Sequence, residues 1–315
     1  MGCIKVSQEL FPNGVQTLSL PSEKLTGSQA PLVIATGDMS GVYFPFGQAM
    51  ADLFRKYNGK ASGTQVTNAS IQNTKLVSQK QAELGFSTVD VLALPETKEK
   101  EILALTGLYS NFIQIVTTQR DIHTLADLRG KRVSIGTDGS GTKLMSERIL
   151  KAANLASEKI DISTLSFTQS ADALRNGTID VAFFSSGLPN PVISELASEM
   201  EISLVPIPKQ IALSLHAEFE FYTLDEISGQ TYEGIKSTPT LAVKNVLVTY
   251  PDLPKQEAYQ IVKTLYNHLS ESQNAHPEAM EINLAEATAG IPIALHPGAK
   301  QFFKEIIHLN KKSAN

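Results

Sequence analysis

The residues with the clearest potential for chemistry form a glycine-rich loop at residues 136–142, GTDGSGT. Residues 133–135 before it have the pattern of a buried strand, and an amphipathic helical pattern begins at residue 142. Glycines let a backbone approach a ligand closely, and the free amides at a helix N-terminus favour an anion. The loop is therefore a candidate anion site, while Ser140 or Thr142 acting as a plain helix N-cap is the alternative.

Another loop of the same kind lies earlier in the chain, at residues 37–41, GDMSG. It follows a predicted strand at 31–36 and precedes a helical pattern that begins at Val42 or Tyr43. One ligand held between the two loops is the simplest use for both. Tyr43 would offer that ligand a phenol or a ring face, and a core position under the first helix is its alternative.

The composition indicates a globular chain with enough length for two domains. It has 315 residues, of which 42% are hydrophobic and 19% charged. The net charge of −5 argues against a nucleic-acid partner, which usually requires a basic face. No run of 18 apolar residues occurs, so we expect no transmembrane helix.

The first 30 residues read as a poorly ordered leader or tether. Cys3 is the only cysteine, which rules out an intrachain disulfide. Its position ahead of a polar tract is typical of an exported protein after signal removal, which predicts a periplasmic or extracytoplasmic location. Two roles stay open for Cys3, the acylated cysteine of a lipoprotein or a free thiol near a disordered terminus.

Strands and helices alternate along the chain, which predicts an α/β fold with a largely parallel sheet. Residues 103–109 and 112–118 read as two separate apolar strands, and residues 240–249 as one long strand. Residues 210–221 read as one helix.

Four enzyme classes find little support in the residues. Residues 136–143 read G-x4-G-T-K, which reverses the Lys-Thr order of a nucleotide-binding P-loop. Neither Ser40 nor Ser140 lies in a G-x-S-x-G nucleophile motif, and no G-x-G-x-x-G follows a strand. The six histidines are scattered and have no metal-ligand spacing. We therefore predict binding without catalysis, with no catalytic residue, no metal and no cofactor.

Five segments in order then carry a family resemblance: VIATGDMSGVYFPFG, TNASIQN, LADLRGKRVSIGTDGSGT, VAFFSSGLPNPV and GIPIALHPGA. Together they resemble the TAXI-type solute-binding proteins of TRAP transporters, over residues 32–303. The resemblance implies the two-lobed periplasmic-binding-protein fold, type II-like, with a mostly parallel sheet in each lobe and the ligand in the cleft. Lobe 1 would comprise residues 31–118 plus 217–315, and lobe 2 residues 119–216.

The resemblance also supplies candidate ligand-binding residues. They are Gly37, Ser40, Gly41, Tyr43, Ser70, Asn73, Thr88, Asp138, Gly139, Ser140, Gly141, Thr142, Ser186, Gly187 and Asn190. The chain departs from the family pattern at Phe44, Ala69 and the segment 88–90. For Asp138, where the family often has proline, three roles stay open: facing solvent, capping the turn, or selecting a ligand with an amino group.

The resemblance implies a monomeric, non-enzymatic receptor for a small organic anion, which it delivers to TRAP membrane subunits. Glutamate, 2-oxoglutarate or another C4–C5 dicarboxylate is the ligand that the family suggests, whereas the residues alone indicate only a small carboxylate. The alternatives are a ligand-sensing module for a signalling partner and an enzyme built on the same fold.

Overall fold

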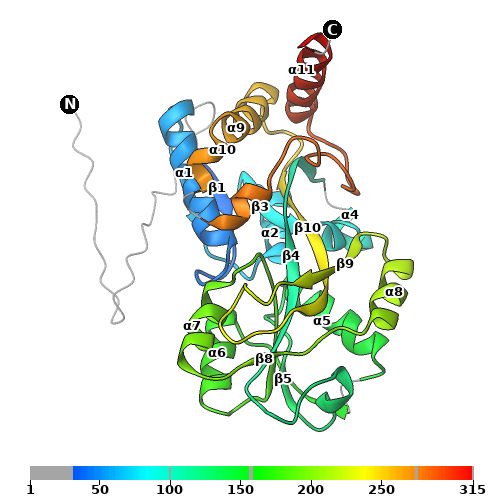
Figure 1. Cartoon of the computed structure of the whole chain (residues 1–315). Coiled ribbons are helices and arrows are strands. Elements are labelled where there is room, and N and C mark those ends of the chain that lie inside the picture. Colours follow the sequence, from blue (N-terminus) through cyan, green and yellow to red (C-terminus); the bar gives the residue numbers. More distant parts are fainter. Residues whose placement is uncertain (1–30, 99–100, 156–158, 274–275, 314–315) are drawn as a thin grey trace, which may run out of the picture. The chain divides into compact units, whose positions relative to one another are not determined.

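The computed structural model describes residues 31–98, 101–155, 159–273 and 276–313, without the side chains of residues 273 and 309–313 (Figure 1). The leader and Cys3 lie outside the described residues. The strands are β1 (Leu32–Ala35), β2 (Ser62–Gln65), β3 (Leu84–Thr88), β4 (Leu103–Thr117), β5 (Arg132–Ser134), β6 (Asp161–Ser163), β7 (Val181–Ser186), β8 (Ser203–Leu204), β9 (Tyr222–Ile227) and β10 (Thr238–Thr249).

The helices flank these strands. They are α1 (Tyr43–Asn58), α2 (Ser70–Ser78), α3 (Val89–Leu92), α4 (Pro95–Lys98), α5 (Gly141–Ala152), α6 (Phe167–Arg175), α7 (Pro191–Glu199), α8 (Lys209–Glu218), α9 (Lys255–Asn267), α10 (Leu269–Gln273) and α11 (Pro297–Ser313), with 3₁₀ turns η1 (Leu125–Leu128) and η3 (Pro277–Glu281).

The strands form one mixed sheet in the order β2-β1-β3-β10-β4-β7-β5-β6, with β8 paired to β4 and β9 to β10. Strands β1, β2 and β3 are parallel, and so are β5, β6 and β7. The two long strands between these groups, β4 and β10, are antiparallel to their neighbours. The predicted α/β fold is confirmed, but its sheet is mixed, because the chain passes between the two groups on β4 and β10.

The two long strands β4 and β10 separate the fold into two halves. The first half is β1–β3 with α1, α2, α3 and α9–α11, and the second half is β5–β7 with α5, α6 and α7. Figure 1 shows α1, α9 and α11 at one end and α5–α7 at the other. The predicted lobe boundaries stay a prediction.

The prediction of two strands at 103–109 and 112–118 was wrong, since β4 is continuous. The polar pair Ser110-Asn111 suggested a break. Both residues instead pair with β10, at Lys244 and Val243. The side-chain oxygen of Asn111 accepts a hydrogen bond from the Asn245 amide at 2.8 Å, which satisfies a polar group inside the sheet.

The prediction of one helix over 210–221 was also wrong at its C-terminal end. Helix α8 ends at Glu218, and residues 222–227 form strand β9 on the edge of β10. Four consecutive residues of β9, 223–226, are exposed. The segment therefore lacks the alternation of apolar and polar residues that marks a half-buried strand.

Three apolar clusters hold the helices on the sheet. One cluster runs along a single face from β1 and α2 to α5 and α8, and so spans both halves. A second lies under α1, α9 and α11, and a third under α6 and α7. Val42 and Tyr43 belong to the second cluster, and Phe167 packs against the third. The candidate site lies where these two clusters approach each other.

Candidate ligand-binding cavity

A cavity of about 70 Å³ lies between the two halves. Its lining is Gly37, Asp38, Gly41, Val42, Tyr43, Thr67, Asn68, Ala69, Ser70, Thr88, Asn111, Thr137, Ser140, Gly141, Thr142, Leu165, Ser166, Phe167, Ser185 and Ser186.

Four helices of nine residues or more begin at this cavity. They are α1 and α2 from the first half and α5 and α6 from the second, and the residues at each N-terminus are part of the lining. The first amides of a helix have no acceptor within the helix, and each N-terminus carries about half a positive charge. The cavity is therefore lined by converging dipoles that favour a negative group.

The second loop, residues 136–142, turns sharply before α5. Gly136 and Gly139 have φ angles of 92° and 82°, which favour glycine. A Cβ on Gly136 would lie 2.8 Å from the Thr142 side chain. The Ser140 hydroxyl accepts a hydrogen bond from the Lys143 amide at 3.1 Å and thus caps α5. This bond leaves the first two amides of the helix, those of Gly141 and Thr142, at the cavity wall.

The first loop, residues 37–41, has a different internal geometry. Asp38 Oδ1 accepts hydrogen bonds from the Ser40 amide at 2.9 Å and from the Ser40 hydroxyl at 2.6 Å. The Asp38 carbonyl accepts from the Gly41 amide at 3.0 Å. Helix α1 then begins without a side-chain cap. Asp38 lines the cavity, whereas Ser40 does not.

Tyr43 has the predicted core position and also reaches the cavity, while its contact with a ligand stays a prediction. Its ring is buried in the core and stacks on Phe86 with 4.8 Å between ring centroids. Its hydroxyl donates to Asn245 Oδ1, lies 3.5 Å from Ser70 Oγ, and reaches the cavity lining. Burial raises the pKa of Tyr43 well above its ordinary value. Tyr43 is thus a neutral hydrogen-bonding group at every physiological pH.

The two halves approach closely at the cavity. A Cβ on Gly141 of the second half would lie 3.1 Å from Ser70 Oγ and 3.2 Å from Thr88 Oγ1 of the first. Thr88 is 2% exposed and lines the cavity. Its side chain also interacts with Asp90 and lowers the pKa of that carboxyl.

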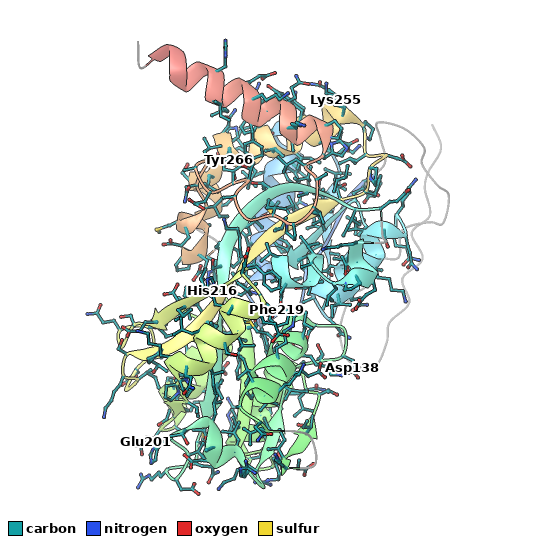
Figure 2. All side chains as sticks on the ribbon, turned by 90° about the vertical axis from the view of Figure 1, so that its right-hand side faces the viewer. Asp138, Glu201, His216, Phe219, Lys255 and Tyr266 are labelled. Carbon is teal, nitrogen blue, oxygen red and sulfur yellow. The ribbon has the colours of Figure 1, made fainter. Side chains whose placement is uncertain are left out.

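Backbone contacts of the second loop also join the halves. The Gly139 carbonyl accepts hydrogen bonds from the amides of Ile71 and Gln72, each at 3.1 Å. Asn68 Nδ2 donates to the Asp138 carbonyl at 3.1 Å. The Asp138 side chain itself points to solvent and pairs with Lys143 at 2.6 Å (Figure 2). Of the three roles left open for Asp138, the structure thus places its carboxylate in solvent.

An ion pair at 3.7 Å between the partly buried Arg148 of α5 and the buried Asp90 forms a further connection between the halves. Arg148 of α5 donates to the Tyr222 hydroxyl at 2.6 Å, and that hydroxyl donates to Asp90 at 2.9 Å. The Arg148 guanidinium also lies 4.1 Å from the Phe219 ring centroid. Phe219 lies where α8 leads into β9 (Figure 2). Burial raises the pKa of the Asp90 carboxyl, and Arg148 lowers it. This pair connects helix α5 to Asp90, which lies two positions after Thr88.

The turn after β7 contributes one wall and one packing contact. Ser186 lines the cavity, and its hydroxyl accepts from Asn190 at 2.9 Å and from Gln114 at 3.0 Å. Asn190 caps α7. Gly187 packs against Glu278 of η3, whose carboxylate accepts from the Leu188 amide. Burial raises the pKa of Glu278 to about 7.

The structure brings nine of the fifteen predicted residues to the cavity wall: Gly37, Gly41, Tyr43, Ser70, Thr88, Ser140, Gly141, Thr142 and Ser186. The remaining six are Ser40, Asn73, Asp138, Gly139, Gly187 and Asn190, which lie outside that lining. Asn73 is fully buried and bonds Thr36 and Phe86 carbonyls. Ligand contact by any of the fifteen stays a prediction.

Sequence reasoning missed several lining residues on the second half and in β4. Ser166 and Phe167 begin α6, because Ser166 and Gln169 form a capping box there. The sequence signal for this cap is the pattern S-x-x-Q at residues 166–169. Asn111 was missed because a polar residue within an apolar stretch suggested a loop.

Within the described residues, no group of three or more His, Cys, Asp or Glu side chains is arranged to hold a metal ion. None of the described helices has the length and apolar character to span a membrane.

Solved structures share this fold at low sequence identity. A protein from Bordetella bronchiseptica RB50 is 15% identical over 89% of this chain and 98% of its own, with a TM-score of 0.55. A protein from Listeria monocytogenes named for L-cystine ABC transport is 11% identical, over 78% and 93%, with a TM-score of 0.52. The ligand-binding component of an ABC-type import system from Staphylococcus aureus, with zinc bound, is 12% identical, over 90% and 92%, with a TM-score of 0.51.

The fold is therefore the one seen in ligand-binding components of import systems, with helices on both faces of a mixed sheet. The model of the NMT1-like family matches residues 34–306, which is most of the chain. The chain belongs to the NMT1-like family.

Proposed function

We propose that this protein is an extracytoplasmic solute-binding receptor that encloses a small carboxylate between its two halves and delivers it to membrane permease subunits. Glutamate, 2-oxoglutarate or another C4–C5 dicarboxylate is the proposed ligand. The family match and the fold shared with import-system components support the receptor assignment.

The convergence of four helix N-termini on one small cavity carries the proposal. Backbone amides and hydroxyls bind a carboxylate through charge-assisted hydrogen bonds, each contributing about 1.5–3 kcal/mol. Thr88, Ser70 and Tyr43 on one half face Gly141 and Thr142 on the other. A ligand that contacts both sets stabilises the closed arrangement, which is the form that a permease would recognise.

The proposal also specifies the class of transporter, which is a TRAP transporter. The five motifs that resemble TAXI-type proteins favour a TRAP transporter, whereas the similar solved structures named above come from ABC-type systems. Co-purification with membrane subunits encoded beside the gene would distinguish the two. Permease subunits without an ATPase would support TRAP, and an ATPase partner would overturn it.

A thermal-shift screen against carboxylates, amino acids and phosphates tests the receptor assignment. A ligand at a hundred times its dissociation constant adds about 2.7 kcal/mol to stability, which raises the melting temperature by several degrees. The chain has no tryptophan, so an external dye reports the transition. Native mass spectrometry of the same sample excludes a retained ligand. A ligand-free protein that no compound stabilises would overturn the proposal.

A further inference from the structure

The charge inventory of the cavity points to a more specific ligand class. Among the described residues that line it, Asp38 is the one charged side chain. The lining otherwise offers backbone amides, hydroxyls, side-chain amides and apolar groups. Among the described residues that line the cavity, positive potential comes from the helix N-termini, which lie beside a carboxylate.

The position of that carboxylate is fixed by its own loop. Ser40 donates two hydrogen bonds to Asp38 Oδ1, at 2.9 Å from its amide and 2.6 Å from its hydroxyl. Among the described residues, the second carboxylate oxygen makes no hydrogen bond or ion pair. Asp38 is thus a residue of the cavity wall with one unbonded acceptor oxygen.

The cavity therefore presents opposite charges to a ligand. The helix N-termini favour a carboxylate, and Asp38 favours a cationic hydrogen-bond donor. A dianion without an amino group would bring two negative charges to a cavity that contains a third and no side-chain cation. A compact zwitterion matches both features, and the volume of about 70 Å³ limits it to a small molecule.

We propose that Asp38 is a specificity-determining residue that binds the ammonium group of the ligand and so selects an α-amino acid over the corresponding 2-oxo acid. This inference rests on the proposed receptor function and narrows its ligand class. It assigns to Asp38 the amino-group role that the sequence left open for Asp138.

Asp138 provides a matched control. It occupies the same place in the second loop, two residues before the serine, but its side chain is 75% exposed. It pairs with Lys143 and does not line the cavity. Replacing it therefore removes a carboxylate of the same local sequence without changing the cavity wall.

The experiment measures binding by titration calorimetry for L-glutamate with 2-oxoglutarate, L-alanine with pyruvate, and L-leucine with its 2-oxo acid. The proteins are the wild type, Asp38→Asn and Asp138→Asn. Asparagine retains the Oδ1 acceptor for Ser40, so the loop is expected to keep its geometry, which circular dichroism and the melting temperature verify.

We expect the wild type to bind at least one amino acid about tenfold or more tightly than its 2-oxo acid, the effect of a charge-assisted hydrogen bond. Asp38→Asn should remove most of this preference, and Asp138→Asn should leave it within about twofold.

Two results would overturn the inference in distinguishable ways. Equal or tighter binding of the 2-oxo acids by the wild type, or an unchanged preference in Asp38→Asn, would refute the role of Asp38 and leave the receptor function intact. Failure of the folded, ligand-free wild type to bind either member of every pair would refute the carboxylate receptor itself, and the inference with it.

Discussion

The first and second loops contain the same four-residue pattern, Asp-x-Ser-Gly, at residues 38–41 and 138–141, and use it in opposite ways. In the first loop the aspartate lines the cavity and the serine turns away to bond Asp38 and Thr168. In the second loop the serine lines the cavity and caps α5, while the aspartate faces solvent.

The residue between aspartate and serine accounts for the difference. Gly139 adopts a φ of 82°, and the chain turns so that α5 begins directly after Ser140. The first loop has Met39 there, which is 64% exposed, and neither Gly37 nor Gly41 has a positive φ. The second loop thus has a glycine with left-handed geometry where the first has none, and different residues of the pattern line the cavity.

Gly141→Val should have the largest effect on binding and is the strongest test of the second loop. A Cβ there lies 3.1–3.2 Å from Ser70 and Thr88, and the added methyl groups would occupy the space between the halves. The φ of Gly141 is not positive, so we expect the fold to be retained. Calorimetry should show affinity reduced by about a hundredfold or more. Unchanged affinity would refute the assignment of this loop to the ligand site.

Gly136→Ala and Gly37→Ala compare how much unfolding free energy each loop loses when its glycine gains a Cβ. Gly136 combines a φ of 92° with a Cβ only 2.8 Å from Thr142, so alanine should cost about 3 kcal/mol of unfolding free energy. At Gly37 the nearest atoms to a Cβ are 3.4 Å away, which is ordinary contact, and we expect a change below about 1 kcal/mol. Urea denaturation measures both. Equal losses of unfolding free energy in the two variants would contradict the expected difference between the loops.

Glu278→Gln extends the comparison to the turn after β7, whose carboxylate partner comes from η3. Burial raises the pKa of Glu278 from 4.5 to about 7, so the folded protein binds a proton more tightly than the unfolded chain. Its contribution to stability therefore falls as the pH rises from 4.5 through 7, by on the order of 3 kcal/mol.

Denaturation curves of the wild type and Glu278→Gln between pH 4.5 and 8 test this sign. The variant should be less dependent on pH, and its stability relative to the wild type should increase as the pH rises. Glutamine keeps an acceptor for the Leu188 amide. Parallel pH profiles for the two proteins would contradict a raised pKa at Glu278.

Ser140→Ala and Ser40→Ala should give the smallest effects and test the exchange of roles directly. Ser140 caps α5, so its loss should cost about 1 kcal/mol. Ser40 caps no helix and bonds partly exposed groups, so its loss should cost about half a kcal/mol or less. Thermal denaturation compares them, and a larger loss for Ser40→Ala would show that the first loop depends on its serine more than the second does.

The sequence by itself determined the α/β class and the position of both loops. Strand patterns followed by glycine, serine and a helical periodicity are local signals, and the local backbone obeys them. Nine of the residues predicted from the family-like motifs line one cavity, and they come from both halves. Local patterns did not predict the continuous strand β4 or the edge strand β9. Both strands pair with β10, which lies more than a hundred residues from β4 and bonds the polar Asn111 within it.

Only the tertiary structure decided which aspartate belongs to the cavity. Asp38 and Asp138 each stand two residues before a serine, and the sequence predicted a ligand role for Asp138 and not for Asp38. The choice depends on the backbone turn at Gly139 and on the approach of the two halves, which leaves Asp38 in the wall and Asp138 beside Lys143. Side-chain direction follows from φ and from packing between distant segments, and neither is encoded in a four-residue motif.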